Sequence, residues 1–220
     1  MIGTILPVKI LTLRLLPNLS SGLLRELGLS PKNRSIGLIS TDCDDVTYMA
    51  LDEATKVANV EVVYGKSLYA GASNASTKLA GEVIGILAGP TPSEVVSGLR
   101  GAEAFIKKGV GFRTANEAEN VVYLAHCISR TGSYLSGLAN IPVGQALAYL
   151  IAPPVEAVIG LDAALKASDV ELCTFYAPPT ETNFGGGLLT GTQSACQAAC
   201  DAFADAVIAV VNKPEDMGGM

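Results

Sequence analysis

Short runs of aliphatic and β-branched residues, bounded by Gly, Asp or Ser, recur along the chain and predict strands. Longer segments with helical spacing of apolar residues lie between some of these runs. We expect strands at residues 35–39, 60–64, 82–87, 146–151, 170–174 and 187–190. Each half of the chain is therefore predicted to be an α+β sandwich, in which several antiparallel strands are covered on one face by helices.

The clearest helix signal follows the third predicted strand. Thr91 has the side chain of an N-cap, Pro92 suits the first helical position, and Glu94 completes a capping box. Lys107 and Lys108 place positive charge where the helix is expected to end.

The remaining helices are expected by analogy with this one or from their caps. A second long helix is predicted near residues 194–211, and a third over residues 116–129 between the two halves. Asp52 is expected to cap a short helix that runs to Ala58, and Asp162 to cap its counterpart.

An internal repeat is the most informative pattern. Segments 51–61 and 161–171, about 110 positions apart, match at six of eleven positions. The repeat predicts two similar domains, residues 1–110 with an N-terminal extension and residues 111–220. Two equivalent domains in one chain also predict symmetric assembly. The matching residues of the first segment are Leu51, Asp52, Ala54, Lys56, Val60 and Glu61.

Composition supports assembly and argues against two classes of partner. Hydrophobic residues make up 49% of the chain, charged residues 16%, and the mean hydropathy is +0.39, so we expect extensive subunit contacts. A net charge of −6 without a basic run argues against nucleic-acid binding. The most apolar stretch, residues 141–165, is broken by Pro153 and Pro154, so no membrane span is expected. Five cysteines, an odd number, favour a cytosolic origin.

Three carboxylates lie within four residues at Asp42, Asp44 and Asp45, directly after a predicted strand. One interpretation is a solvated, Asx-rich turn. The other is an anionic pocket completed by Glu82, which would suit an ammonium group better than a metal because no His or thiolate partner accompanies it. In the repeat Asp44 and Asp45 correspond to Pro154 and Val155, so either role occurs once per chain.

Other candidate chemistry is weak. His126 is the only histidine and is expected to be structural, on the predicted helix over residues 116–129. Cys196 and Cys200 are four residues apart on a predicted helix and are expected to pack rather than bind metal. The run of glycines at residues 185–187 lacks the residues of a phosphate loop. With no nucleophile and base pair in sight, we expect no enzyme activity, no metal site and no cofactor.

Four longer motifs carry a family resemblance. Residues 35–48, 60–71, 129–135 and 189–196 closely resemble the tandem-domain shell proteins of the ethanolamine-utilization bacterial microcompartment, and the likeness extends from about Leu15 to Val210. It implies two circularly permuted bacterial-microcompartment (BMC) domains per chain and a homotrimer that forms a pseudohexameric disc. Such discs tile edge to edge with other shell proteins, which places the protein in a cytoplasmic microcompartment shell.

The resemblance also implies pores. A central pore is expected to open and close through loops near residues 69–77 and 178–187, and a small pore in each subunit is expected to bind ethanolamine. In this family Arg113 is aromatic in some members, which changes the local charge here. The residues implied for the ethanolamine site are Asp44, Asp45, Glu82, Phe112, Glu181 and Thr182.

A rival interpretation is a tandem sensor or regulatory module that binds an amine and signals to a partner. It shares the acidic pocket, but it predicts discrete oligomers where a shell protein forms extended sheets.

Overall fold

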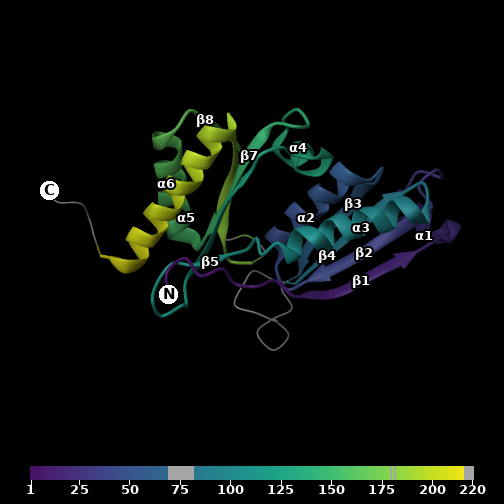
Figure 1. Ribbon diagram of the computed structural model, residues 1–220, viewed down its shortest axis with the longest axis horizontal. Coiled ribbons are helices and arrows are strands. Elements are labelled where there is room, and N and C mark those ends of the chain that lie inside the picture. The colour runs from purple at the N-terminus through teal and green to yellow at the C-terminus, as the bar shows by residue number, and fades with distance from the viewer. Residues whose placement is uncertain (69–81, 179, 181, 216–220) are drawn as a thin grey trace. The chain divides into compact units, whose positions relative to one another are not determined.

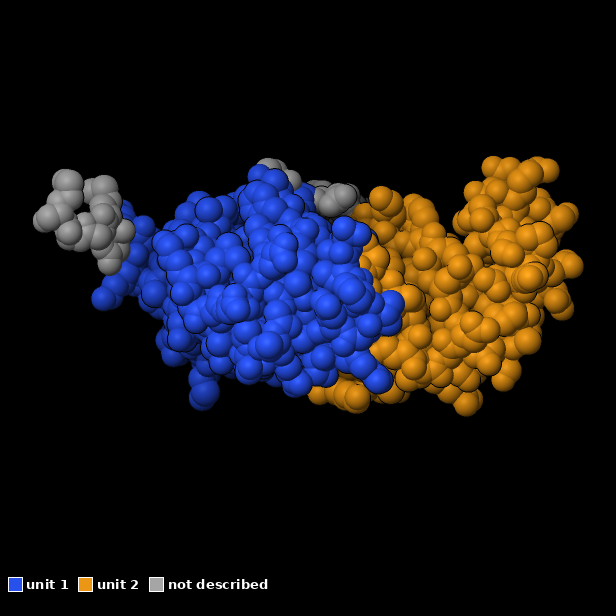
Figure 2. All heavy atoms as spheres, turned by 90° about the horizontal axis from the view of Figure 1, so that it is seen from above, with its two compact units in different colours: residues 1–6, 111–131, 138–220 blue, residues 7–110, 132–137 orange. Residues whose placement is uncertain are grey.

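The computed structural model describes residues 1–68, 82–178, 180 and 182–215. The chain divides into two compact units, shown in different colours in Figure 2. Unit 1 contains residues 1–6, 111–131 and 138–220, and unit 2 contains residues 7–110 and 132–137. Residues 132–137 therefore belong to unit 2, although the segments on both sides of them belong to unit 1.

Unit 2 is built on a four-stranded antiparallel sheet with the order β1-β2-β4-β3. Helices α2 and α3 pack side by side on it (Figure 1). The strands are β1 (Ile10–Leu16), β2 (Ser35–Thr41), β3 (Glu61–Leu68) and β4 (Glu82–Gly89), and the helices are α1 (Ser21–Glu26), α2 (Asp44–Val57) and α3 (Pro92–Lys107).

Unit 1 has a five-stranded antiparallel sheet with the order β5-β6-β7-β9-β8, covered by α5 and α6. The N-terminal segment belongs to this unit, since Gly3 and Leu6 donate backbone hydrogen bonds to Thr114 and Phe112. The strands are β5 (Arg113–Thr114), β6 (Val122–Ile128), β7 (Ala146–Ala152), β8 (Val170–Tyr176) and β9 (Gly185–Gly191), and the helices are α5 (Pro154–Ala167) and α6 (Gln193–Asn212). Helix α4 (Ser133–Ala139) lies between β6 and β7 in the sequence, and its residues 133–137 belong to unit 2.

The internal repeat is visible in the strand register. The order β1-β2-β4-β3 recurs as β6-β7-β9-β8, and Gly65 opposite Gly85 matches Phe175 opposite Gly187. Even the register shift in β3 after Val62 recurs in β8 after Leu172. The two antiparallel sheets with helices packed on them confirm the predicted α+β class.

The capping prediction for α3 is confirmed in part. Thr91 Oγ1 accepts a hydrogen bond from the Glu94 backbone N–H at 3.2 Å, and Pro92 occupies the first helical position. The Glu94 carboxylate does not close a capping box. It accepts a hydrogen bond from the Asn59 backbone N–H at 2.8 Å, which ties α3 to the start of β3.

Two helix starts predicted from the sequence are wrong. The helix around Asp52 begins eight residues earlier, at Asp44, and α5 begins at Pro154 rather than Asp162. The first turn of α2 carries Asp44 and Asp45, which favours a helix N-terminus, and Pro suits the first position of α5.

The predicted helix over residues 116–129 is also wrong, because residues 122–128 form β6. Asn116 starts a turn and not a helix: its side-chain oxygen accepts from the Asn120 backbone N–H at 3.2 Å, and Glu119 has φ of 55°. The β-branched and aromatic residues that follow favour a strand. His126 therefore lies on a strand, opposite Tyr149.

Helix α6 supplies much of the core of unit 1. Among the described residues it is the one helix long and apolar enough to span a membrane by length and composition. One face of α6 is buried against the sheet of unit 1, so α6 packs as a helix of the protein core. Cys196 and Cys200 lie on that face, which confirms the packing prediction, and burial raises the pKa of the Cys196 thiol to about 11.

Candidate functional site

The acidic cluster predicted from the sequence lies where β2 meets α2. Asp44 and Asp45 occupy the first turn of α2, after the N-cap residue Cys43. The side chains of Asp42, Asp44 and Asp45 are only 4%, 4% and 7% exposed, so the interpretation as a solvated turn is wrong. Three acidic side chains are thus held largely out of contact with water at one place in unit 2.

A hydroxyl chain connects this cluster to β3. Asp44 Oδ2 accepts a hydrogen bond from Ser67 Oγ, and Asp44 Oδ1 accepts from the Asp45 backbone N–H at 2.9 Å. Tyr48, one turn further along α2, lies with its hydroxyl 2.9 Å from Ser67 Oγ. Burial, more than the neighbouring carboxylates, raises the pKa of Tyr48, so this phenol stays protonated and able to donate at neutral pH.

Threonine side chains fix the turn that precedes the helix. Thr41 Oγ1 accepts a hydrogen bond from the Cys43 backbone N–H at 3.0 Å, and Thr47 Oγ1 donates to the Cys43 carbonyl at 2.8 Å. Asp42 Oδ1 accepts from the Lys9 backbone N–H at 2.8 Å.

Cys43, the N-cap residue of α2, is not a reactive thiolate. Burial, then the negative charge of Asp45 and Asp44, raises the pKa of its thiol.

The other predicted site residues are distributed over both units. Glu82 begins β4 in unit 2, where its backbone lies opposite Leu68, and its side chain is outside the described part of the chain. Phe112 and Thr182 belong to unit 1, and Glu181 lies outside the described residues. The structure thus brings Asp44 and Asp45 together on α2, and places Phe112 and Thr182 in the other unit.

Within unit 1, Phe112 is fully buried and packs edge to face on Phe184, with ring centroids 5.5 Å apart. Thr182 belongs to a small hydroxyl pair, with its Oγ1 3.1 Å from Thr180 Oγ1. Of the two loops predicted to gate a pore, residues 69–77 lie outside the described part. The second loop is shorter than predicted, because residues 185–187 are the start of β9.

Arg113 is exposed on β5 and its Nη1 donates to the Gly3 carbonyl at 3.5 Å. Its positive charge opposes the effect of burial on Tyr123, whose pKa is raised overall. The described interactions of Arg113 are therefore with residues of unit 1.

A buried acid that the sequence assigned to a helix cap has a different role. Asp52 Oδ2 accepts from the Gly132 backbone N–H at 2.7 Å, and Asp52 Oδ1 accepts from the Leu135 N–H at 2.8 Å. Lys56 Nζ lies 3.2 Å from the same carboxylate. Asp52 thus binds residues 132–137 to α2 within unit 2. A contact between positions eighty residues apart in sequence has no local pattern from which to predict it.

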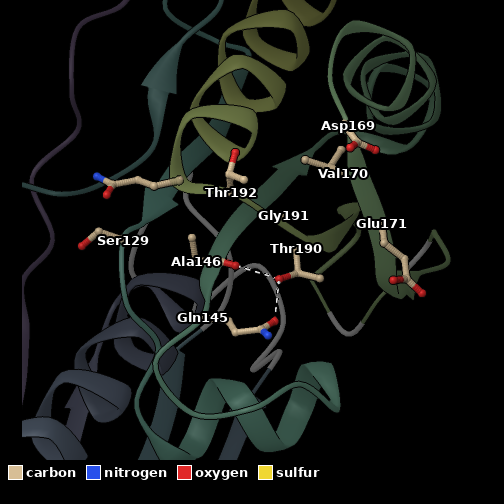
Figure 3. A pocket seen from close by; sticks show the side chains of 10 residues that line it. Ser129, Gln145, Ala146, Asp169, Val170, Glu171, Thr190, Gly191 and Thr192 are labelled. Atoms are coloured by element: carbon tan, nitrogen blue, oxygen red, sulfur yellow. Dashed lines mark hydrogen bonds between the residues drawn. The ribbon is translucent and has the colours of Figure 1, made fainter.

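A depression with a volume of about 600 Å³ lies in unit 1. Figure 3 shows it where β7 begins and β9 ends. Thr190 Oγ1 donates to the Ala146 carbonyl at 2.9 Å, and Gln145 Oε1 lies 3.4 Å from the same hydroxyl. The Glu171 carboxylate points away from both (Figure 3). None of the residues predicted for the ethanolamine site lines this depression.

Within the ranges that the structure describes, no group of three or more His, Cys, Asp or Glu side chains is arranged to hold a metal ion. Buried side-chain polar atoms in the same ranges all have a hydrogen-bond partner.

Two α+β units with one strand order in a single chain define a tandem-domain protein of the bacterial microcompartment shell class, and the family profile "BMC domain" matches residues 35–117. The chain is 61% identical over 206 residues to the bacterial microcompartment shell protein EutL of Clostridium perfringens, covering 94% of this chain and 95% of that protein. EutL of Escherichia coli is 53% identical over 94% of each chain. The crystal structure of EutL from Leptotrichia buccalis superposes with a TM-score of 0.93 at 62% identity, covering 98% of this chain and 100% of that one.

The chain belongs to the EutL family of bacterial microcompartment shell proteins. It is a structural shell component and not an enzyme, as predicted, and its place is the microcompartment shell in the bacterial cytoplasm. As a shell protein it assembles with other shell proteins.

Proposed function

We propose that the chain forms a homotrimeric, pseudohexameric tile with a gated central pore, and that a small pore in each subunit binds ethanolamine. The halves 1–110 and 111–220 would be the two BMC domains, and six domains from three chains would complete the ring. The tile would pass metabolites or cofactors through the shell, and it would pack edge to edge with other shell proteins. The match to EutL over nearly the full chain supports this reading.

The observation that carries the ligand proposal is the burial of Asp44 and Asp45 in the first turn of α2. Ethanolamine has an ammonium and a hydroxyl two carbons apart. Carboxylates bind an ammonium through charge-assisted hydrogen bonds, which are stronger where water is scarce. In the proposed site Asp44, Asp45 and Glu82 hold the ammonium. Thr182 or a backbone group holds the hydroxyl, and Phe112 and Glu181 complete the surroundings.

Ethanolamine would also regulate the pore. If it binds the closed disc more tightly than the open one, it shifts the population toward the closed state by no more than the difference between the two affinities. The loop near residues 69–77 and the segment from Pro178 to the start of β9 are the proposed moving parts.

Calorimetric titration of ethanolamine into wild type, Asp45→Asn and Glu103→Gln tests the site. Glu103 is an acid of α3 already paired with Lys107, with Oε1 2.6 Å from Nζ, and serves as the matched control. We expect binding to wild type and to Glu103→Gln, and at least about tenfold weaker binding to Asp45→Asn, since a charge-assisted hydrogen bond contributes about 1.5–3 kcal/mol. Unchanged affinity in Asp45→Asn would remove Asp45 from the site.

Electron microscopy of concentrated protein separates the shell tile from the amine-sensor alternative. A tile forms extended sheets with a regular lattice, whereas a sensor remains a discrete oligomer. Ethanolamine should be recovered unchanged after incubation with the protein.

A further inference from the structure

The two repeats differ in the burial of one surface, a face of the helix that follows β2 in one half and β7 in the other. On α2 this face is buried, with Met49 at 1% and Asp52 at 1% exposure. The counterparts on α5 are Ile159, which is 42% exposed, and Asp162, whose side chain is 62% exposed. The exposed face of α5 is also apolar. Its exposed apolar residues are Val155, Val158, Ile159 and Leu165, and Asp162 on the same face is paired with Lys166.

Within unit 2, residues 132–137 cover the face of α2. Besides the two hydrogen bonds to Asp52, the Ser133 backbone N–H donates to Thr55 Oγ1 at 3.1 Å. The ring of Tyr134 lies against that of Tyr48, with centroids 6.3 Å apart, and Leu135 is completely buried. The structure therefore contains a pattern for covering this face: a short helix that enters from the other repeat.

The first repeat has its own version of this short helix, α1. Leu19 donates a backbone hydrogen bond to Arg34, just as Thr131 donates to Gln145, and both helices begin two residues after these positions. Each helix is followed by a residue with positive φ, Gly28 at 64° and Asn140 at 53°. Residues 20–25 are thus equivalent to residues 132–137.

Helix α1 carries an apolar residue that is only partly covered. Leu24 is buried in the cluster with Leu19 and Ile36, and it fixes α1 to the sheet of unit 2. Leu23 occupies the position of the buried Leu135, yet Leu23 is 43% exposed. The described chain thus leaves both partners of the equivalent contact, α1 and the face of α5, open to solvent.

Side-chain volumes are exchanged between the two versions of the contact. In unit 2, Tyr134 Oη lies only 2.6 Å from where a Cβ on Gly65 would be, so the large side chain is on the short helix and the small residue is on the strand. At the equivalent positions the strand carries Phe175, which is half exposed, and the short helix carries Gly22. A glycine facing a phenylalanine preserves the combined volume of a tyrosine facing a glycine.

We propose that α1 of a second copy of this chain docks on the α5 face of the first, with Leu23 against Val155, Val158 and Ile159 and with Gly22 over Phe175. Because Leu165 stands where Thr55 accepts a hydrogen bond, this contact is held mainly by apolar burial. The surfaces are different on the two partners, so the contact is head to tail, and in the proposed homotrimer three such contacts close the ring. The proposal rests on the homotrimer of the proposed function and gives it an interface.

Sedimentation velocity of purified full-length variants tests the contact. Val158→Glu places a charge in the α5 face, and Leu23→Glu places one on α1. Each is expected to weaken association by at least about 100-fold and to yield monomers, since an unpaired buried charge is strongly disfavoured. Val57→Glu is the matched control, because Val57 is 58% exposed on α2 but outside the proposed contact, and it should remain trimeric. Leu23→Lys combined with Val158→Glu in one chain should recover part of the lost association.

Failure of the interface and failure of the trimer give different results. A wild-type protein that sediments as a monomer overturns the trimer and this contact with it. A trimeric wild type whose Val158→Glu or Leu23→Glu variant is equally trimeric overturns the contact and leaves the trimer intact. If a variant does not fold, as judged by circular dichroism, amide hydrogen exchange on the wild type replaces it. Residues 21–26 and 154–167 should lose protection on dilution to monomer, and equal exchange in trimer and monomer refutes the docking.

Discussion

Asp52 offers the sharpest test of what holds unit 2 together. Its carboxylate is buried at 1% exposure and accepts the backbone N–H groups of Gly132 and Leu135. Asp52→Ala leaves both donors without an acceptor. A buried donor that loses its acceptor costs about 1–3 kcal/mol, so the two together predict a loss of about 2–6 kcal/mol in the free energy of unfolding. Lys56 adds little to this loss, because its Nζ remains 2.5 Å from Glu53 Oε1.

The assay is urea unfolding followed by circular dichroism, with all variants at one protein concentration. Glu103→Ala is the matched control. It also removes a helical acid paired with a lysine four residues later, but that lysine is mostly exposed, so the cost should be below about 0.5 kcal/mol. Asp52→Asn keeps one acceptor oxygen and should fall between the two. If Asp52→Ala lies within about 1 kcal/mol of Glu103→Ala, Asp52 does not bind residues 132–137 as described.

Two further predictions concern the same segment. A Cβ on Gly132 would lie 2.3 Å from Thr55 Oγ1 and 2.6 Å from the Asp52 carbonyl oxygen, whereas one on Gly137 would meet no atom within 4 Å. Gly132→Ala should therefore destabilise by about 1–3 kcal/mol, while Gly137→Ala should be neutral or slightly stabilising; equal unfolding midpoints would contradict this. Burial, and next the charge of Asp52, raises the pKa of Tyr134 to about 12. An unfolded tyrosine ionises near pH 10, so the contribution of Tyr134 to the free energy of unfolding is complete below about pH 10. It falls by about 2–3 kcal/mol as the pH rises to about 12. Tyr134→Phe should show a smaller fall in pH-dependent unfolding, and a fall identical to that of wild type would show that Tyr134 is not responsible.

Local patterns in the sequence predicted six of the strands and the helices α3 and α6 well, because hydrophobic periodicity and capping chemistry are local. These local patterns failed where the structure of a segment depends on residues far away in the sequence. Asp52 resembles an N-cap, yet its partners are backbone groups of residues 132–135. Residues 122–128 were predicted to be helical, although they are a strand that pairs with β7, a contact that depends on residues far along the chain.

The candidate site shows the same division. The position of Asp44 and Asp45 directly after a strand could be predicted from the order of residues alone. Their burial could not, since a turn with three aspartates is normally solvated, and here Thr41, Thr47 and Ser67 build the surroundings that enclose it. The assignment of Phe112 and Thr182 to the same site came from family resemblance, and remains a prediction.

In the contact within unit 2, Tyr134 faces Gly65, and in the proposed contact Gly22 faces Phe175. This exchange of side-chain volumes determines whether a ring built from such contacts can have an odd number of domains. Two first repeats in succession would set Gly22 against Gly65 and leave a void, and two second repeats would force Tyr134 against Phe175. Only alternation of the two repeats satisfies every junction. A ring with an odd number of domains would contain at least one mismatched junction. Because each chain carries one copy of each repeat, every ring of whole chains has an even number of domains, and rings of five or seven domains are excluded.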